Sequence, residues 1–319
     1  MNYWNKCYYN RWNIGFIEQS ASELICSQRT TFSVRWLQHC LYDRFFADPF
    51  ILSYDSHTIQ VLVEEYPYDI KRGLISRLII DRKSYTLLDK KVLLDMPFHQ
   101  SFPYIYRSGS RIYVIPESSA SGHLYRYTYN EQNCTLSQQE VLLLERVLDP
   151  TFVCHQENEY LFCTKRGEGA NSDLYLYSRD MNQPNASFRP CCRQPICHDA
   201  DAARPAGYIL SIGDTLYRVT QVCSRQYGEW VKVYRITDLS PDTFSQEFVK
   251  DIHLELSPFH SAFHTLNGWN ELTVVDGIKR EFRPLLRLKC ECKYMMSFLK
   301  DLLVLQTRSL SQRKKTTLQ

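Results

Sequence analysis

The chain has 319 residues, of which 44% are hydrophobic and 23% are charged, and its formal net charge is +3. This composition is ordinary for a soluble globular protein. The small charge, without a basic stripe interleaved with aromatic residues, argues against a nucleic-acid-binding protein. No segment approaches the roughly 20 apolar residues of a membrane span, and the N-terminus lacks the apolar run of a signal peptide. We therefore expect a cytoplasmic protein without a membrane span.

A tight turn followed by a short apolar strand recurs five times along the chain. The first four of these strand starts contain a proline, and successive prolines lie about 50 residues apart. A period of this length, built from short strands, is typical of a β-propeller. The five starts are residues 46–52, 100–106, 147–153, 203–210 and 262–266, of which the last lacks the proline.

The remaining elements fit around these starts in chain order. Residues 12–18 read as a strand that closes the last blade, and residues 21–40 as a short irregular or helical segment. The blades follow as apolar hairpins with outer strands. We predict an all-β fold, a five-bladed β-propeller over about residues 12–285. A C-terminal helix over about 286–306 would pack outside it, before a polar tail at 307–319, all within a single domain of residues 1–319.

Strand starts of successive blades meet at one end of a propeller channel, so residues far apart in sequence would share one pocket. Asp48 and Asp149 occupy the same repeat position, each followed by a proline that fixes its own φ and sharpens the turn. Two carboxylates aimed across one cavity are the arrangement that glycoside chemistry uses. The alternative is that each aspartate is an ordinary turn former whose side chain caps backbone amides.

Further candidates come from the same strand ends. Glu117 follows an apolar strand and is a candidate proton donor, although a charged strand end that faces solvent is the competing interpretation. Arg204 stands at the repeat position of the aspartates, and its planar guanidinium suits a carboxylate or phosphate. It would otherwise pair with Asp48 or Asp149 and neutralise it. The other candidate substrate-binding residues are Gln221, Tyr227, His264, His99 and Asn267.

Cys191, Cys192, Cys197 and His198 form the chain's densest group of metal-ligand residue types. Their spacing is not that of a zinc finger or ribbon, and no second paired knuckle follows. Phosphate-binding glycine loops and zinc-protease motifs are not present either. We therefore expect no metal and no cofactor.

Taken together in their order and spacing, the motifs resemble one known family. They are FADPFIL at 46–52, SFPY at 101–104, YVIPES at 113–118, LDPT at 148–151, ARPAG at 203–207, Gln221 with SRQYG at 224–228, HTLN at 264–267 and VDG at 275–277. The resemblance, over roughly residues 12–285, is to the N-terminal propeller domain of glucosamine inositolphosphorylceramide transferases and to its stand-alone bacterial relatives from polysaccharide loci.

The resemblance implies a five-bladed propeller similar to the clan of arabinanases, β-xylosidases and invertase-like enzymes. That clan uses an Asp base in blade one, an Asp in blade three that tunes the acid, and a Glu acid in blade four. Asp48 and Asp149 match the first two positions. Blade four has Arg204 and Gln221 where the acid is expected, so Glu117 of blade two becomes the candidate acid.

These observations leave three hypotheses. The first is a carbohydrate-active enzyme of glycan or polysaccharide biosynthesis, which acts on an anionic or amino sugar or a sugar nucleotide. The second is a non-catalytic glycan-binding or scaffolding propeller that partners with a separate glycosyltransferase. The third is a protein-interaction propeller that binds through its rim. The plant transferases carry a glycosyltransferase domain after the propeller. We recognise none in this sequence and expect their transferase activity not to carry over.

Overall fold

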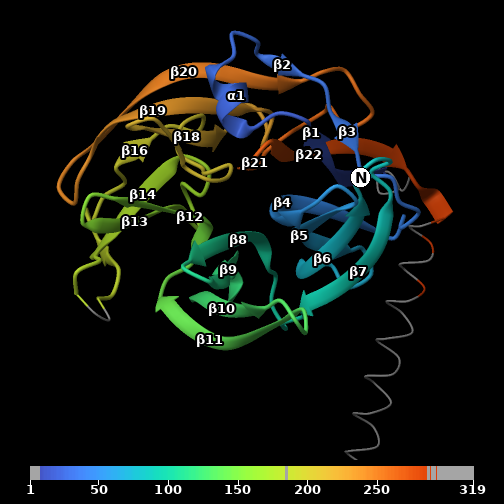
Figure 1. Ribbon diagram of the computed structural model, residues 1–319, viewed down its shortest axis with the longest axis horizontal. Helices are drawn as coiled ribbons and strands as arrows, with labels where there is room; N and C mark the ends of the chain where they lie inside the picture. The colour runs from blue at the N-terminus through green and yellow to red at the C-terminus, as the bar shows by residue number, and fades with distance from the viewer. Residues whose placement is uncertain (1–7, 184–185, 286–287, 289–291, 293–319) are drawn as a thin grey trace, which may run out of the picture.

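The computed structural model describes residues 8–183 and 186–285, together with Leu288 and Cys292. Five antiparallel blades stand around a central channel (Figure 1). The regular secondary structure of the described chain is almost entirely strand, with one short α-helix, α1 (Ala21–Cys26). The predicted all-β, five-bladed propeller is therefore confirmed.

The first two blades are four-stranded meanders that run outward from the channel in chain order. Blade one comprises β4 (Arg44–Tyr54), β5 (Thr58–Pro67), β6 (Leu74–Asp81) and β7 (Leu87–Leu94). Blade two comprises β8 (Ser101–Ser108), β9 (Arg111–Glu117), β10 (Leu124–Asn130) and β11 (Thr135–Leu143), with the 3₁₀ turn Ser119–Ser121 after β9.

Blades three and four have less regular outer edges. Blade three comprises β12 (Val147–His155), β13 (Asn158–Lys165) and β14 (Asp173–Asp180), edged by β15 (Arg189–Pro190) and β16 (Cys197–His198). Blade four comprises β17 (Leu210–Ile212), β18 (Thr215–Gln221), β19 (Val231–Leu239) and β20 (Phe244–Leu254), and the N-terminal segment adds β2 (Thr31–Phe32) to its edge.

Blade five joins the two ends of the propeller. Its strands from the channel outward are β21 (Leu266–Trp269), β22 (Leu272–Phe282), β1 (Tyr8–Ile17) and β3 (Arg35–Trp36). β1 pairs with β22 over ten residues, from Tyr8 opposite Phe282 to Ile17 opposite Thr273. The N-terminal strand predicted at 12–18 does complete the last blade. Because the two ends of the described chain share this blade, their pairing closes the propeller.

In blades one to three the prolines of the repeat do not precede the inner strands, as the sequence suggested, but lie inside them, whereas Pro205 does precede β17 of blade four. In blades one to three the pairing register shifts at this point, which marks a β-bulge. The residue before each proline has a positive φ, 50° at Asp48, 43° at Phe102 and 48° at Asp149. Such left-handed backbone is costly for residues other than glycine and clusters at functional sites. The bulge therefore gives the repeat position its distinct geometry.

Aromatic rings fill the channel a few residues further along these strands. Phe50 packs edge-on against Phe102, Tyr104 and Tyr208, with ring centroids 5.0–5.7 Å apart. The Tyr104 hydroxyl donates to the Phe152 carbonyl at 2.9 Å. Four blades contribute to this aromatic cluster, so its packing holds them together. The cluster also lies next to the bulges along the same strands.

The predicted C-terminal helix at 286–306 and tail at 307–319 lie outside the described residues, apart from Leu288 and Cys292. Among the residues that the structure describes, no helix has the length and apolar character needed to cross a membrane.

Candidate functional site

The bulged strand starts converge on one pocket of about 480 Å³ at the end of the channel. Most of the residues predicted for the site do line it, although they come from all five blades. They are Asp48, His99, Glu117, Asp149, Arg204, Tyr227 and His264. Gln221 and Asn267 do not line it, whereas Glu64 and Trp12, which were not predicted for the site, do.

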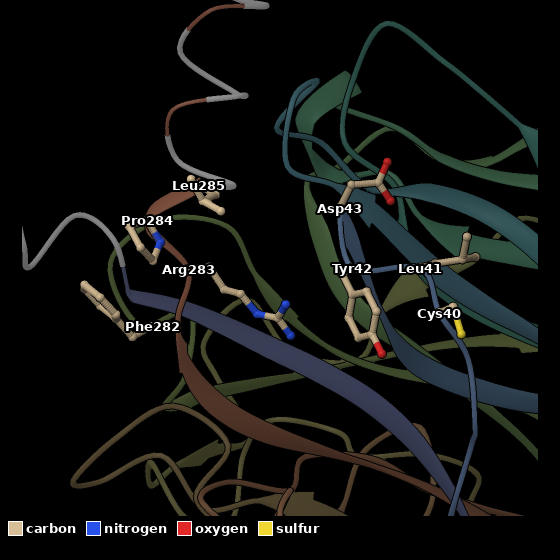
Figure 2. Close-up of a pocket in the computed structure, with 8 residues that line it drawn as sticks. All are labelled: Cys40, Leu41, Tyr42, Asp43, Phe282, Arg283, Pro284 and Leu285. Atoms are coloured by element: carbon tan, nitrogen blue, oxygen red, sulfur yellow. The ribbon is translucent and has the colours of Figure 1, made fainter.

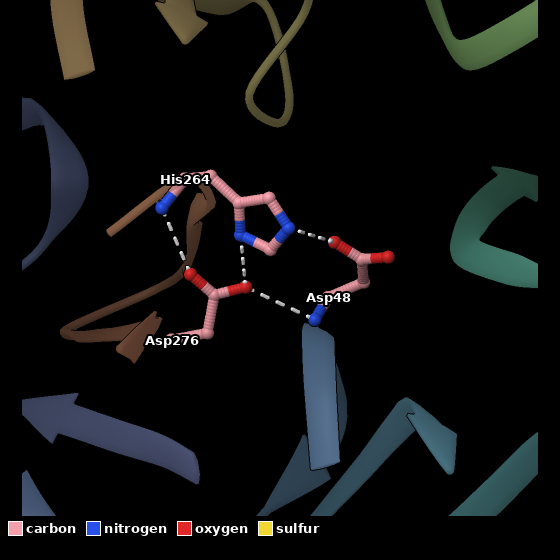
Figure 3. Close-up of side chains that lie close together, drawn as sticks. All are labelled: Asp48, His264 and Asp276. Atoms are coloured by element: carbon pink, nitrogen blue, oxygen red, sulfur yellow. Dashed lines mark hydrogen bonds and ion pairs between the residues drawn. The ribbon is translucent and has the colours of Figure 1, made fainter. Parts of the chain in front are cut away.

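His264 links two carboxylates of this site (Figure 3). Its Nδ1 lies 2.7 Å from Asp276 Oδ2, and its Nε2 lies 3.5 Å from Asp48 Oδ1. Burial alone would lower the pKa of His264, but the neighbouring Asp276 carboxylate raises it overall. Burial alone would raise the pKa of Asp276, but the neighbouring His264 lowers it below its ordinary value overall. The imidazole therefore holds its second proton more readily than an ordinary histidine, and it presents Nε2 to Asp48.

Close packing by Trp12 and Gly228 holds the His264 side chain in place. Trp12 of β1 stacks on it with ring centroids 4.2 Å apart and planes inclined by 22°. Gly228, whose φ is 62°, lies so close that a Cβ there would come within 2.5 Å of His264 Cβ. This close approach and this φ together require glycine. His264 is thus positioned by blades four and five.

Asp48 is the buried carboxyl at the blade-one bulge, with 5% of its surface exposed. Its Oδ2 accepts a hydrogen bond from the Phe102 amide of the next blade at 3.0 Å. Burial raises the pKa of Asp48 to about 7, with His264 opposing the change and Asp149 reinforcing it. A carboxyl with this pKa exchanges a proton near neutral pH, as a general base does.

Glu117 lies at the end of β9, also 5% exposed, and not in solvent as its strand-end position would allow. The Ser119 hydroxyl donates to its Oε1 at 2.9 Å. Burial, followed by the nearby Asp149 carboxylate, raises the pKa of Glu117 to about 8, although Arg204 opposes the change. Glu117 is therefore mostly protonated at pH 7, which is the state a proton donor needs.

Asp149 and Arg204 form a buried salt bridge between blades three and four. Arg204 Nε donates to Asp149 Oδ2 at 2.6 Å, and Nη1 donates to Asn171 Oδ1 at 2.8 Å. Gln221 Nε2 donates to the same Asp149 oxygen at 2.8 Å. Tyr227, which is 43% exposed, lies against the guanidinium, with its ring centroid 4.9 Å from Arg204 Cζ. Of the two interpretations of Arg204, pairing with an aspartate is the one that the geometry shows.

Two of the predicted binding residues are engaged by the protein itself. Besides Asp149, Gln221 Nε2 donates to the Pro205 carbonyl at 2.8 Å. Asn267 Nδ2 donates to the Pro49 carbonyl at 2.9 Å, and its Oδ1 accepts from the Tyr208 amide at 3.0 Å. Asn267 thus ties blade five to blades one and four, which is a structural role.

Glu64 and His99 form a second pair beside the pocket. The Gly73 amide donates to His99 Nδ1 at 2.8 Å, so the neutral ring carries its proton on Nε2, which lies 3.5 Å from Glu64 Oε1. Burial lowers the pKa of His99 to about 4, so the ring is neutral at pH 7. Burial also raises the pKa of Glu64 well above its ordinary value. Glu64 of β5 is buried, with 7% of its surface exposed, and does not face solvent.

Asp48, His264 and Asp276 also bring ligand-type atoms within 4.8 Å of one another, which raises the question of a metal ion. The Asp276 carboxylate already accepts from the amides of Asp48, His264 and Thr265 and from the Thr265 hydroxyl. These four donors use the roughly four lone-pair positions of a carboxylate, and His264 Nδ1 adds an ion pair at 2.7 Å. The group therefore fits a proton relay better than a metal site.

A different hollow, of about 510 Å³, lies at the outer edge between residues 40–43 and 282–285 (Figure 2). Its two charged side chains are already paired, since Asp43 accepts from Arg44 and Arg283 donates to Glu281. Tyr42 lies over Arg283 at 4.8 Å. This mostly apolar hollow lacks the grouped titratable residues of the channel pocket.

Two solved structures with the same fold are α-L-arabinofuranosidases. An α-L-arabinofuranosidase from Podospora anserina in complex with cellotriose superposes with a TM-score of 0.55 at 8% identity, over 77% of this chain and 94% of that chain. The catalytic domain of a Coprinopsis cinerea α-L-arabinofuranosidase gives 0.54 at 9% identity, over 84% of this chain and 96% of that chain. At such identities the likeness concerns the fold alone.

Sequence comparison identifies nearer relatives. Glucosamine inositolphosphorylceramide transferase 1 of Arabidopsis thaliana is 28% identical over 234 residues, which are 72% of this chain and 30% of the relative. The same-named protein of Oryza sativa subsp. indica is 26% identical over 233 residues, 71% of this chain and 30% of the relative. The chain thus spans about 30% of the length of these relatives. The family model described as "Glucosamine inositolphosphorylceramide transferase 1, N-terminal" matches residues 24–274, and the chain therefore belongs to that family.

Proposed function

We propose that the channel pocket binds a sugar and cleaves or transfers it at its glycosidic bond during glycan biosynthesis. The observation that carries this proposal is the pair Asp48 and Glu117. Both are buried carboxyls that line one pocket, and their pKa values are raised to about 7 and about 8. Titratable groups shifted by burial and by each other in a cleft are typical of catalytic sites.

In this mechanism Glu117 is the general acid and Asp48 the general base. Asp48 takes a proton from a water or sugar hydroxyl, whose oxygen forms a bond to the anomeric carbon. The bond from that carbon to the leaving oxygen breaks, and this oxygen receives the Glu117 proton. The His264 imidazole beside Asp48 favours the ionised base. Asp149, held by Arg204, raises the pKa of Glu117 and keeps it protonated until the bond breaks.

The charge of the pocket favours an amino sugar over an anionic one. Its lining contains the carboxyls Asp48, Glu64, Glu117 and Asp149, whereas the guanidinium of Arg204 is already bound to Asp149 and Asn171. Glu117 is mostly protonated and Asp48 only partly ionised at pH 7, but the oxygens of these carboxyls can still accept hydrogen bonds from an ammonium group. A carboxylate or phosphate would instead find the Arg204 guanidinium occupied. Trp12 and Tyr227 supply rings for the apolar face of a pyranose. The name of the relatives, which contains glucosamine, agrees with this choice.

The test combines binding and turnover. Thermal shift should show that glucosamine stabilises the protein, by about 2.7 kcal/mol at 100 times its dissociation constant. Glucuronate should not. The α- and β-anomers of p-nitrophenyl glucosaminide then report turnover. Asp48→Asn should lower it by about 10²–10⁴-fold and leave glucosamine binding within a few-fold, while the exposed Asp214→Asn control should change neither.

One observation favours a second candidate function. Blade four presents Arg204, which neutralises Asp149, at the repeat position, and no carboxylate of that blade lines the pocket. A non-catalytic propeller that holds a glycan for a separate glycosyltransferase would have such a site. Binding of glucosamine without turnover of either anomer, and without any effect of Asp48→Asn beyond binding, would establish this alternative.

A further inference from the structure

A groove of about 660 Å³ adjoins the channel pocket. The two hollows share Tyr8, Asn10, Trp12 and Tyr227 in their linings. The half-exposed Tyr227 ring therefore lies at the junction between them. A ligand that fills the pocket has a continuous path into this groove.

The groove exists because β1 and β22 continue past the site. Asp276 of β22 belongs to the His264 network, and the strand runs on to Phe282. Trp12 pairs with Ile278, and Asn10 pairs with Arg280. Since alternate residues of paired strands share a face, these side chains and Tyr8 form one wall. The opposite wall consists of residues 226–227 and 261–262.

Arg280 sets the chemistry of the groove. It is exposed, its Cζ lies 4.7 Å from the Tyr8 ring centroid, and it makes no salt bridge within the described part of the chain. The neighbouring carboxylate Glu281 is engaged by Arg11, Lys279 and Arg283. The groove thus offers an unneutralised guanidinium on an aromatic ring, whereas the pocket beside it is lined by carboxyl groups.

We propose that this groove is a second subsite, which binds an anionic group on the sugar next to the one held in the channel. The proposal rests on the proposed amino-sugar site. Arg280 stands four residues after Asp276 on β22, a path of about 13 Å at 3.3 Å per residue. That distance places the anion beyond the ring in the pocket. A carboxylate and a phosphate ester both suit the guanidinium fork.

Three disaccharides test the subsite by calorimetry on the full chain. All carry glucosamine at the non-reducing end, linked to glucose, to glucuronate or to glucose 6-phosphate. The charged second sugars should bind about five- to tenfold more tightly than glucose, as one charge-assisted contact at an exposed site provides. The stronger of the two charged ligands identifies carboxylate or phosphate as the natural group. Equal binding of all three would overturn the proposal.

Arg280→Gln should remove the preference for the charged ligands and leave the glucosaminyl-glucose affinity unchanged. Arg111→Gln is the matched control, because Arg111 is an exposed arginine at the opposite end of β9 from Glu117. It should retain the preference. In the wild type, raising the salt concentration should reduce the advantage of the charged ligands. If no glucosaminide binds, the proposed function fails. If glucosamine binds and Arg280→Gln behaves like Arg111→Gln, only the subsite fails.

Discussion

Replacing Glu117 by Gln should make the protein more stable at alkaline pH. In the folded protein, burial and the Asp149 carboxylate raise the pKa of Glu117 from 4.5 to about 8. Between these values the folded state holds a proton that the unfolded state has lost. Stability therefore falls as the pH rises through this window, by about 1.4 kcal/mol per pH unit. The full penalty above pH 8 is at most about 5 kcal/mol, and the neutral amide of Glu117→Gln does not incur it.

Urea unfolding at pH 5, 7 and 9 measures this effect. At pH 5 the two proteins should have similar free energies of unfolding, since Gln retains an oxygen that accepts from Ser119. At pH 9 the variant should be more stable by roughly 2–5 kcal/mol. The exposed Glu255→Gln control should follow the wild type at every pH. A Glu117→Gln variant that is less stable than the wild type by the same amount at all three pH values would refute the reasoning.

Two other substitutions test the interactions that hold the site residues in place. Arg204→Met leaves the Asp149 carboxylate buried without its cation and should cost about 3–5 kcal/mol. Adding Asp149→Asn should recover most of this loss, and urea unfolding of the two single variants and the double variant completes the cycle. Gly228→Ala should cost more than Gly213→Ala and also weaken glucosamine binding. Both glycines have φ near 60°, but only Gly228 has a neighbour, His264, within reach of a Cβ. Equal losses would contradict the packing argument.

The spacing of the prolines predicted the fold, because the inner strands of blades one to three repeat the same local backbone. The same register brought Asp48, Asp149, Arg204 and His264 into one pocket, as predicted. The outer strands β7 and β11 were not anticipated. Their side chains are largely exposed, so they lack the apolar alternation that marks a half-buried strand.

Glu64 was not predicted as a site residue, and for a different reason. Glu64 and Glu65 are adjacent in β5, and both are buried, but their side chains point to opposite faces of the blade. Glu64 lines the pocket, whereas Glu65 pairs with Arg44 and Lys90. The sequence shows only two adjacent charged residues. The three-dimensional arrangement is needed to see that Glu64 lines the pocket and that Glu65 pairs within its own blade.

The two repeat-position aspartates have the same strained backbone and differ in the cation that another blade supplies. Arg204 beside Asp149 keeps its charge at all accessible pH values. His264 beside Asp48 gains or loses its charge, and Asp276 adjusts how readily it does so. A repeated bulge thus produces one carboxylate in a fixed electrostatic environment and one in an environment that responds to protons. This difference, which arises in blades four and five and not in the repeat itself, supports the tuning role that we propose for Asp149 and the base role that we propose for Asp48.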